Sequence, residues 1–301
     1  MNQILTTLRQ YTPSDYISSP VSIQTMHTYN LNYIFPKEVN ELTHGKQYLF
    51  LNHRIIFFYT TENTDKFFSY IDRLLFLLKP ATSVDAVILL SSAKKTYPEN
   101  RVFGEPHVNT GFWCAGKIVI YRKEEWFKVF IHECFHHLHY EKVLFDESLT
   151  KRILALFKVD SEVNLYESYC EVWARTLNCC MMSVCHKIPF EILLYHEKRY
   201  AVRHMVNVLH HMNLNYHKLY THKPCKYTEN TNVLAYVVIT AILMYHDFIP
   251  THLSSMPSFT LMDAEPYIHF IETHYKSRPF LNFVNHIKST VTTRMSLCSL
   301  T

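Results

Sequence analysis

Glycine is confined to the first part of the chain, and this constrains how the rest can fold. The 301 residues contain four glycines, Gly45, Gly104, Gly111 and Gly116, and none follows Gly116. Tight hairpin turns depend on glycine, so the long remainder is better suited to helices than to a meandering sheet. We therefore predict an α+β fold with an N-terminal mixed lobe, residues 1–146, and a mainly helical C-terminal lobe, residues 147–301.

The N-terminal lobe carries the patterns expected of strands. Residues 47–61 contain two apolar runs separated by a short polar turn, which predicts a hairpin. Residues 86–90 form an apolar run between turn residues and are expected to be a buried strand. Residues 109–114 and 117–121 are expected to form two further strands joined by a glycine turn.

Helices are expected where apolar residues recur with helical spacing and a cap or a proline marks an end. Thr64 is placed to cap the first long helix, and the acidic pair Glu124 and Glu125 suits the start of another. The expected helices span residues 65–79, 123–141, 148–158, 161–184, 189–212, 230–246, 263–276 and 280–293.

The helix expected over residues 123–141 contains a His-Glu-x-x-His motif, His132 to His136. Two histidines four residues apart lie on one face of a helix, about one turn apart, and can bind one zinc ion. Glu133 would then lie beside the metal, where a general base is useful. His137 leaves a second spacing open, in which the second ligand is rotated by about 100° around the helix.

A catalytic zinc ion usually has three protein ligands and one water. The helix expected over residues 161–184 offers the third, because Glu167 and Glu171 project near its apolar stripe. A carboxylate that is turned inward is costly unless it is paired or binds a metal. We therefore expect Glu167 to bind zinc and Glu171 to accept a hydrogen bond from a ligating histidine. Two simpler interpretations stay open, in which Glu167 is a surface carboxylate and Glu171 pairs with Arg175.

The pattern His132-Glu133-x-x-His136, followed on the next long helix by Glu167-x-x-x-Glu171, resembles the gluzincin branch of zinc metallopeptidases. The resemblance covers residues 109–180. It implies a zincin-like core, one zinc ion held by His132, His136 and Glu167, and Glu133 as general base. The family usually has aspartate where this chain has Glu171. Residues 109–126 also resemble, more loosely, uncharacterised metallopeptidase-like proteins encoded by large DNA viruses.

The resemblance also implies how substrate is handled. In that family an edge strand pairs with the substrate backbone, and Asn109, Gly111 and Phe112 are placed for this role. A histidine or tyrosine from a later helix often stabilises the oxyanion. The sequence leaves six candidates for that donor: His204, His210, His211, Tyr216, Tyr236 and Tyr245.

The predicted function is that of a zinc metallopeptidase acting on a peptide or protein. One alternative is a non-enzymatic structural or interaction protein, for example of a viral particle, that keeps a zincin-like fold. The 21 tyrosines and 20 phenylalanines, with only 19% charged residues, would suit burial in an assembly. A third interpretation is a zinc hydrolase that cleaves a non-peptide bond.

The composition argues against other classes. The formal net charge is +4 and the basic residues are scattered, so a nucleic-acid partner is not expected. The longest apolar run, residues 233–245, is too short to span a bilayer, and residues 1–20 lack the apolar core of a signal peptide. The eight cysteines contain no Cys-x-x-Cys pair. We expect reduced, buried thiols in the cytoplasm, or in the virion if the protein is viral.

Overall fold

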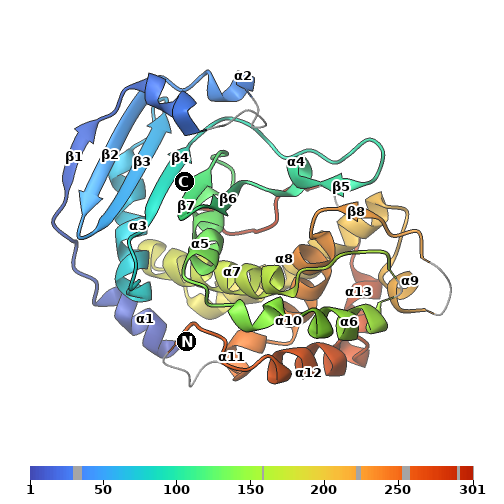
Figure 1. Ribbon diagram of the computed structural model, residues 1–301. Helices are drawn as coiled ribbons and strands as arrows, with labels where there is room; N and C mark the ends of the chain where they lie inside the picture. Colours follow the sequence, from blue (N-terminus) through green and yellow to red (C-terminus); the bar gives the residue numbers. More distant parts are fainter. Residues whose placement is uncertain (30–35, 158, 222–224, 253–257, 290–291, 301) are drawn as a thin grey trace.

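The computed structural model describes the whole chain except residues 30–35, 158, 222–224, 253–257, 290–291 and 301. Helices and a mixed sheet together make an α+β architecture (Figure 1). The strands are β1 (Ile17–Pro20), β2 (His44–Phe50), β3 (His53–Tyr59), β4 (Asp85–Leu89), β5 (Phe103–Gly104), β6 (Gly111–Cys114), β7 (Lys117–Ile120) and β8 (Glu229–Asn230).

The helices of the first half alternate with these strands, and from α5 to α9 the elements are all helical. They are α1 (Asn2–Arg9), the 3-10 helix η1 (Ile23–Tyr29), α2 (Pro36–Val39), α3 (Thr64–Leu78), α4 (Glu105–Val108), α5 (Trp126–His137), the 3-10 helix η2 (Lys142–Phe145) and α6 (Glu147–Leu156). The remainder are α7 (Leu165–His186), α8 (Phe190–His211), α9 (Tyr216–Tyr220), the π-helix η3 (Leu234–Ile239), α10 (Thr240–Tyr245), α11 (Phe248–His252), α12 (Glu265–His274) and α13 (Arg278–His286). Among the described residues, no helix is both long enough and apolar enough to cross a bilayer.

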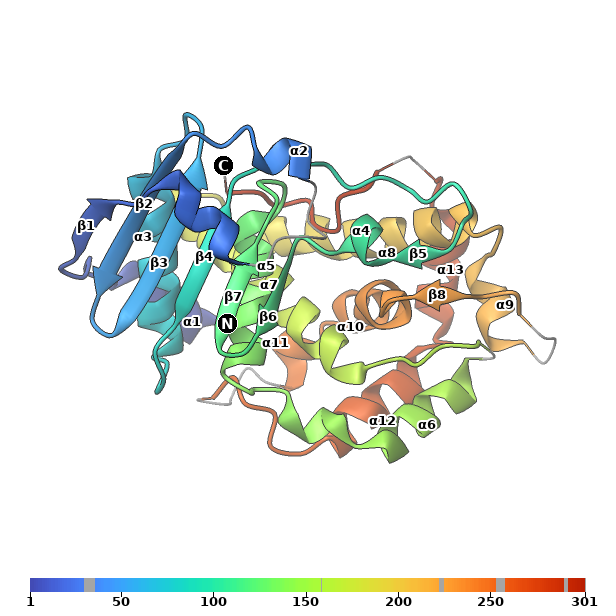
Figure 2. The ribbon, with the colours of Figure 1, turned by 45° about the horizontal axis from the view of Figure 1, so that its top comes forward.

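Six strands form the main sheet, in the order β1-β2-β3-β4-β7-β6. The predicted hairpin is confirmed, since β2 and β3 pair in antiparallel fashion from His44–Tyr59 to Phe50–His53. The strands β3, β4 and β7 run parallel, and β6 returns antiparallel to β7. The strand β6 is therefore an edge of the sheet, and it lies over the helix α5 (Figure 2).

The two faces of the sheet are covered differently. The helices α3 and α5 pack on one face of the sheet. Alternate strand residues on that face, such as Phe57 and Ile88, are buried in the main apolar core. The other face, with Phe58 and Val87, forms a smaller cluster with Met26. The main core continues from the sheet into the helices α7, α8 and α10, so the strands and the C-terminal helices share one apolar interior.

Several predicted boundaries differ from the structure. The helix α5 begins at Trp126 because Glu125 has a left-handed backbone (φ 60°), and it ends at His137 instead of reaching Glu141. The helix α7 begins at Leu165 and not at residue 161. The cap of α3 is Asn63, whose side chain accepts a hydrogen bond from the backbone N–H of Lys66.

Two of the predicted C-terminal helices are interrupted or shortened. Residues 230–246 begin with the last residue of strand β8 and pass through the π-helix η3 before the α-helix α10. Residues 280–293 are helical only as far as His286, and the described residues beyond Ile287 form no helix.

His204 is a buried histidine in α8 whose two ring nitrogens have no hydrogen-bond partner among the described residues. Burial, and to a smaller extent Arg175, lowers its pKa to about 3. The ring stays neutral in the folded protein at pH 5 but binds a proton in the unfolded chain below its ordinary pKa. Stability therefore falls as the pH drops from about 6.5 towards 3.

We expect His204→Leu to reduce the acid sensitivity of the fold. At about 1.4 kcal/mol per pH unit, the wild type should lose about 2 kcal/mol from this residue between pH 6.5 and pH 5, and the variant should not. Urea unfolding at pH 7 and pH 5 measures the difference. His210→Leu, at an exposed position of the same helix, is the control. Equal pH dependence in wild type and His204→Leu would contradict the prediction.

Candidate metal centre

The helix α5 places both histidines of the His-Glu-x-x-His motif against α7. His132 is 5% exposed and Glu167 is 9% exposed, so both groups lie in the interior beside each other. His132 Nε2 lies 3.1 Å from Glu167 Oε2, and His136 Nε2 lies 3.2 Å from the same oxygen. The two Nε2 atoms are 3.0 Å apart. One donor atom from each of the three residues predicted from the sequence therefore lies at a corner of a nearly equilateral triangle.

This triangle has the size expected of one face of the tetrahedron that ligand atoms form around a zinc ion. Zinc binds nitrogen and oxygen at about 2.0–2.1 Å in tetrahedral geometry, which places neighbouring ligand atoms about 3.3–3.4 Å apart. The separations of 3.0–3.2 Å are within a few tenths of an ångström of this value. His132, His136 and Glu167 therefore fit a zinc ion with little rearrangement.

His136 is held from its other ring nitrogen by Glu141. The Nδ1 atom of His136 is 2.9 Å from Glu141 Oε1, and the Glu141 side chain is 1% exposed. Cys170 Sγ, on α7, lies 3.7 Å from the same Nδ1. A carboxylate that accepts the Nδ1 proton fixes the tautomer and leaves Nε2 free to bind a metal. Glu141 therefore orients His136.

Glu141 was missed by the sequence analysis, which extended the helix to this residue. Five residues along a helix correspond to 500°, so Glu141 on a continued α5 would point about 140° away from His136. Instead, His139 adopts a left-handed conformation (φ 54°) just after the helix ends. That turn brings Glu141 back beneath His136. No local sequence pattern shows this reversal.

We expect Glu141→Ala to weaken zinc binding by about 10–100-fold, because loss of a carboxylate behind a ligating histidine has effects of this size. Competition with a chromogenic zinc chelator measures the change. Glu147→Ala, at an exposed position at the start of α6, is the control. Unchanged zinc affinity in Glu141→Ala would show that His136 is oriented without it.

His132 has a different neighbour, Glu171, at its Nδ1 atom. Glu171 Oε2 is 3.4 Å from this atom, an ion-pair distance without hydrogen-bond geometry. Both Glu171 oxygens accept hydrogen bonds from Lys128 Nζ, at 3.0 and 2.8 Å. The alternative partner considered for Glu171, Arg175, pairs with Glu197 instead, at 2.7 Å. Glu171 thus lies behind His132 without accepting the expected hydrogen bond from that ring, and its hydrogen bonds go to a lysine that the sequence did not indicate.

His137 does not join this site. Its Nδ1 accepts a hydrogen bond from the Trp113 indole N–H at 3.2 Å, and its Nε2 donates to the backbone oxygen of Ser83 at 2.8 Å. Both ring nitrogens are therefore engaged outside the donor triangle. The structure favours the spacing that uses His132 and His136.

The pKa shifts of Glu167 and His132 reflect the attraction between the carboxylate and the imidazole. Burial raises the pKa of Glu167, but hydrogen bonds to His132 and His136 outweigh it and lower the pKa below its ordinary range. Burial lowers the pKa of His132, and the hydrogen bond to Glu167 reverses this, so the imidazole pKa is raised. An ionised carboxylate between two imidazoles is a strongly cation-attracting arrangement.

Glu133 and Tyr236 border the same space. Both line the cleft that exposes the donor triangle, and the Tyr236 ring lies 5.8 Å from the His132 ring. Burial raises the pKa of the Glu133 carboxyl, although the charges of His132 and His136 partly offset this. Of the six residues considered as oxyanion donors, all within the described chain, Tyr236 alone lines this cleft. It stands on the π-helix η3, a rare element that is frequent at functional sites.

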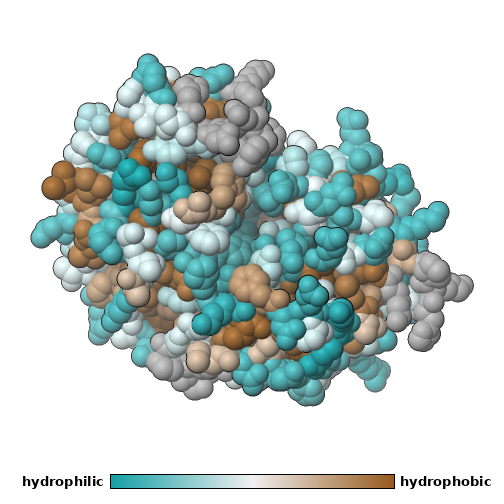
Figure 3. Space-filling model, in the orientation of Figure 1, coloured by the Kyte–Doolittle hydropathy of each residue, from teal (hydrophilic) through white to brown (hydrophobic). Residues whose placement is uncertain are grey.

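The cleft has a volume of about 400 Å³ and opens between the edge strand and the helices. Figure 3 shows the surface hollowed, with mainly hydrophilic residues around it, where the sheet meets the helical part. Asn109, Gly111 and Phe112, the predicted substrate-strand residues, all line it. Gly111 has no room for a side chain, because a Cβ atom would lie 2.5 Å from Ile120 Cδ1. This lets β6 pack closely on β7 and α5.

Aromatic side chains form a second wall of the cleft. Trp113, Phe145 and Tyr166 line it, and the rings of Phe145 and Tyr166 are 4.6 Å apart. Asn232, from the loop before η3, also lines the cleft and lies 3.5 Å from Glu167 Oε1 through its amide nitrogen. The sequence analysis missed Asn232 and Phe145 because neither belongs to a local motif.

Comparisons of this chain with protein-family models, with curated proteins and with solved structures gave no match.

Proposed function

We propose that this chain is a zinc-dependent peptidase with a zincin-like core. The observation that carries the proposal is the triangle of His132 Nε2, His136 Nε2 and Glu167 Oε2, with sides of 3.0–3.2 Å, at the base of an open cleft. The two histidines lie on α5 and the glutamate lies on α7, so the motif alone does not bring the three residues together. A chance His-Glu-x-x-His sequence would have no reason to meet a buried glutamate.

The surroundings of the triangle favour a peptide substrate. The strand β6 pairs with β7 on one side and ends the sheet on the other, and its residues line the cleft. An extended peptide can add to such an edge by backbone hydrogen bonds. The aromatic residues Trp113, Phe145 and Tyr166 would then contact its side chains, which favours apolar residues near the cleaved bond.

The proposed roles of the residues follow from their positions. Zinc held by His132, His136 and Glu167 would supply Lewis acidity to the carbonyl and lower the pKa of water. Glu133, raised in pKa by burial, takes the proton of the attacking water and passes it to the leaving amine. Tyr236 donates a hydrogen bond to the developing oxyanion. Glu141 keeps the His136 imidazole oriented through its hydrogen bond, and Glu171 places a negative charge 3.4 Å from His132 Nδ1.

The test combines metal content with turnover. We expect the purified protein to contain one zinc per chain, to cleave members of a broad peptide library, to lose activity on treatment with a chelator and to regain it when zinc is added. Mass spectrometry of the products identifies any cleaved bond. Glu167→Ala should lose zinc, while Glu162→Ala, at an exposed position just before α7, should retain it.

Three results would overturn parts of the proposal. Absence of zinc from the wild type, or full zinc affinity in Glu167→Ala, would show that the ligand set is wrong. Zinc binding without cleavage of any peptide would favour the non-enzymatic scaffold, or a hydrolase that acts on another kind of bond.

A further inference from the structure

The C-terminal segment returns to the interior after α13. Residues 292–300, which we call the tail, have no regular secondary structure, yet Met295, Ser296, Cys298 and Leu300 are buried. In Figures 1 and 2 the tail crosses the molecule from α13 to the region of α5 and the sheet, where the chain ends. A segment without its own backbone pairing needs other partners for its buried N–H groups.

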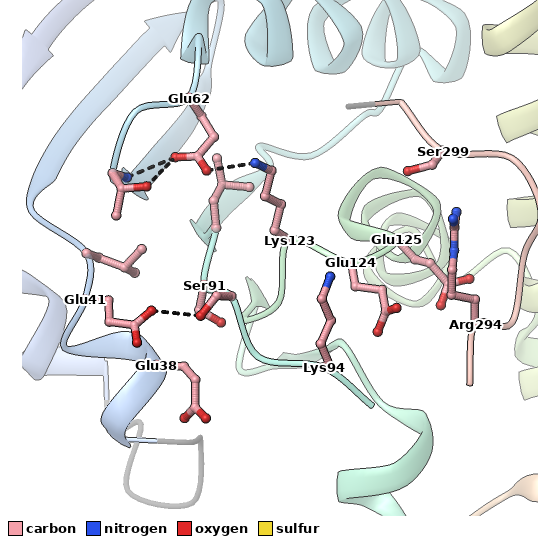
Figure 4. Close-up of a pocket in the computed structure, with 14 residues that line it drawn as sticks. Glu38, Glu41, Glu62, Ser91, Lys94, Lys123, Glu124, Glu125, Arg294 and Ser299 are labelled. Carbon is pink, nitrogen blue, oxygen red and sulfur yellow. Dashed lines mark hydrogen bonds and ion pairs between the residues drawn. The ribbon is translucent and has the colours of Figure 1, made fainter. Parts of the chain in front are cut away.

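Two buried carboxylates supply those partners. Glu125, directly before α5, accepts hydrogen bonds from the backbone N–H groups of Met295 and Ser296. Glu197, on α8, accepts from the N–H groups of Leu297 at 2.9 Å and Cys298 at 3.4 Å. Figure 4 shows Arg294 and Ser299 beside Glu125, at a second cavity near the start of α5.

The tail also contacts the elements that build the candidate metal centre. The indole N–H of Trp126, the first residue of α5, donates to the backbone oxygen of Leu300 at 3.0 Å. Met295 lines a small cavity together with His132, Glu133 and Tyr236. The tail therefore forms a wall behind the helix that carries the His-Glu-x-x-His motif.

One thiol of the tail faces a thiol of α7. Cys298 Sγ lies 3.7 Å from Cys179 Sγ, and the Asn178 side chain donates to the Cys298 backbone oxygen at 3.1 Å. Glu197 does not complete a metal site with this pair, because Arg175 and the tail N–H groups occupy its oxygens. The two sulfur atoms would have to approach by less than about 2 Å to reach the S–S bond length of about 2.05 Å.

We propose that Cys179 and Cys298 are a disulfide-forming pair that fastens the tail to α7 when the protein meets an oxidant. With glutathione disulfide as oxidant, a thiolate of the pair attacks it and releases one glutathione. The second thiolate then attacks the mixed disulfide and releases another. The two thiols lose two protons and two electrons, and the oxidant becomes two molecules of glutathione. Brief release of the tail gives the oxidant access.

Oxidation of the folded full-length protein with excess glutathione disulfide tests the pair. Tryptic digestion without reductant should yield residues 176–187 joined to residues 295–301, at a mass about two hydrogens below the sum of the two peptides. Because Cys179, Cys180 and Cys185 share the first peptide, variants are needed to identify the partner. Cys180→Ser and Cys185→Ser should retain the linked peptide, and Cys179→Ser and Cys298→Ser should lose it.

A second measurement shows whether the bond holds the tail. Hydrogen exchange of the amides of residues 295–298 should be at least about tenfold slower in the oxidised protein than in the reduced protein, because opening then requires a larger part of the chain to move. Cys298→Ser should exchange at one rate in both conditions. No linked peptide from the wild type, undiminished linkage in Cys179→Ser, or equal exchange in both redox states would overturn the proposal.

Discussion

Replacement of Glu133 by glutamine should greatly reduce peptide cleavage while zinc and the fold are retained. The change exchanges one carboxylate oxygen for an amide group of the same shape and removes the group that accepts the proton of water. General acid–base catalysis typically contributes about 10²–10⁴-fold, so we expect a loss of this size in kcat/KM. Glu133 supplies none of the three donor atoms, and zinc content should therefore stay at one per chain. Steady-state cleavage of the best library peptide measures the loss.

The matched control for this variant is Glu105→Gln, because Glu105 lines the same cleft but is exposed on α4. It should keep activity within a few-fold of the wild type. Equal turnover by Glu133→Gln and the wild type would exclude Glu133 as the general base and leave the scaffold alternative in place. A loss of zinc in Glu133→Gln would instead assign this residue a role in metal binding.

The parts of the fold that local patterns specify were predictable. The β2–β3 hairpin and the β6–β7 pair follow from apolar runs divided by turn residues, and the structure contains both. The edge strand β1 was missed because its residues are mostly exposed and show no alternation. The helix α1 was missed because its polar sequence buries only Leu5 and Leu8.

The ends of helices were less predictable because distant residues set them. The tail N–H groups bind Glu125, and this residue takes a left-handed conformation where the sequence suggested a helical turn. Asn164 donates to Asn232 and Ser161 contacts Glu229, which keeps residues 161–164 out of α7. Such contacts link residues far apart in sequence, and no local periodicity reveals them.

The candidate site divides in the same way. The spacing within one helix predicted His132 and His136, and the cost of burying a carboxylate predicted Glu167. Glu141 and Tyr236 needed the tertiary structure, since one depends on a reversal of the chain and the other on a π-helix. Lys128 also escaped prediction, because a lysine on an apolar helix is more often exposed.

Lys128→Met should destabilise the protein by about 3–5 kcal/mol, the second large effect that we expect. Lys128 and Glu171 are 3% and 1% exposed, and their two hydrogen bonds join α5 to α7, the helices that carry the three proposed zinc ligands. Methionine fills a similar volume but leaves the Glu171 carboxylate without its lysine partner in the interior. Removal of one member of a buried ion pair typically costs this much. Urea unfolding at pH 7 measures the change.

The double variant Lys128→Met/Glu171→Leu separates the cost of an unpaired charge from the value of the pair. Because it removes both charges, it should recover most of the stability lost by Lys128→Met. Lys46→Met, which breaks a partly exposed pair with Asp65, should cost less than about 1 kcal/mol. If Lys128→Met also costs less than about 1 kcal/mol, Glu171 finds compensation elsewhere, and the His132 ring, with its Nδ1 atom 3.4 Å away, is placed to provide it. In that case Glu171 acts chiefly on His132, and Glu171→Gln should weaken zinc binding about as much as Glu141→Ala.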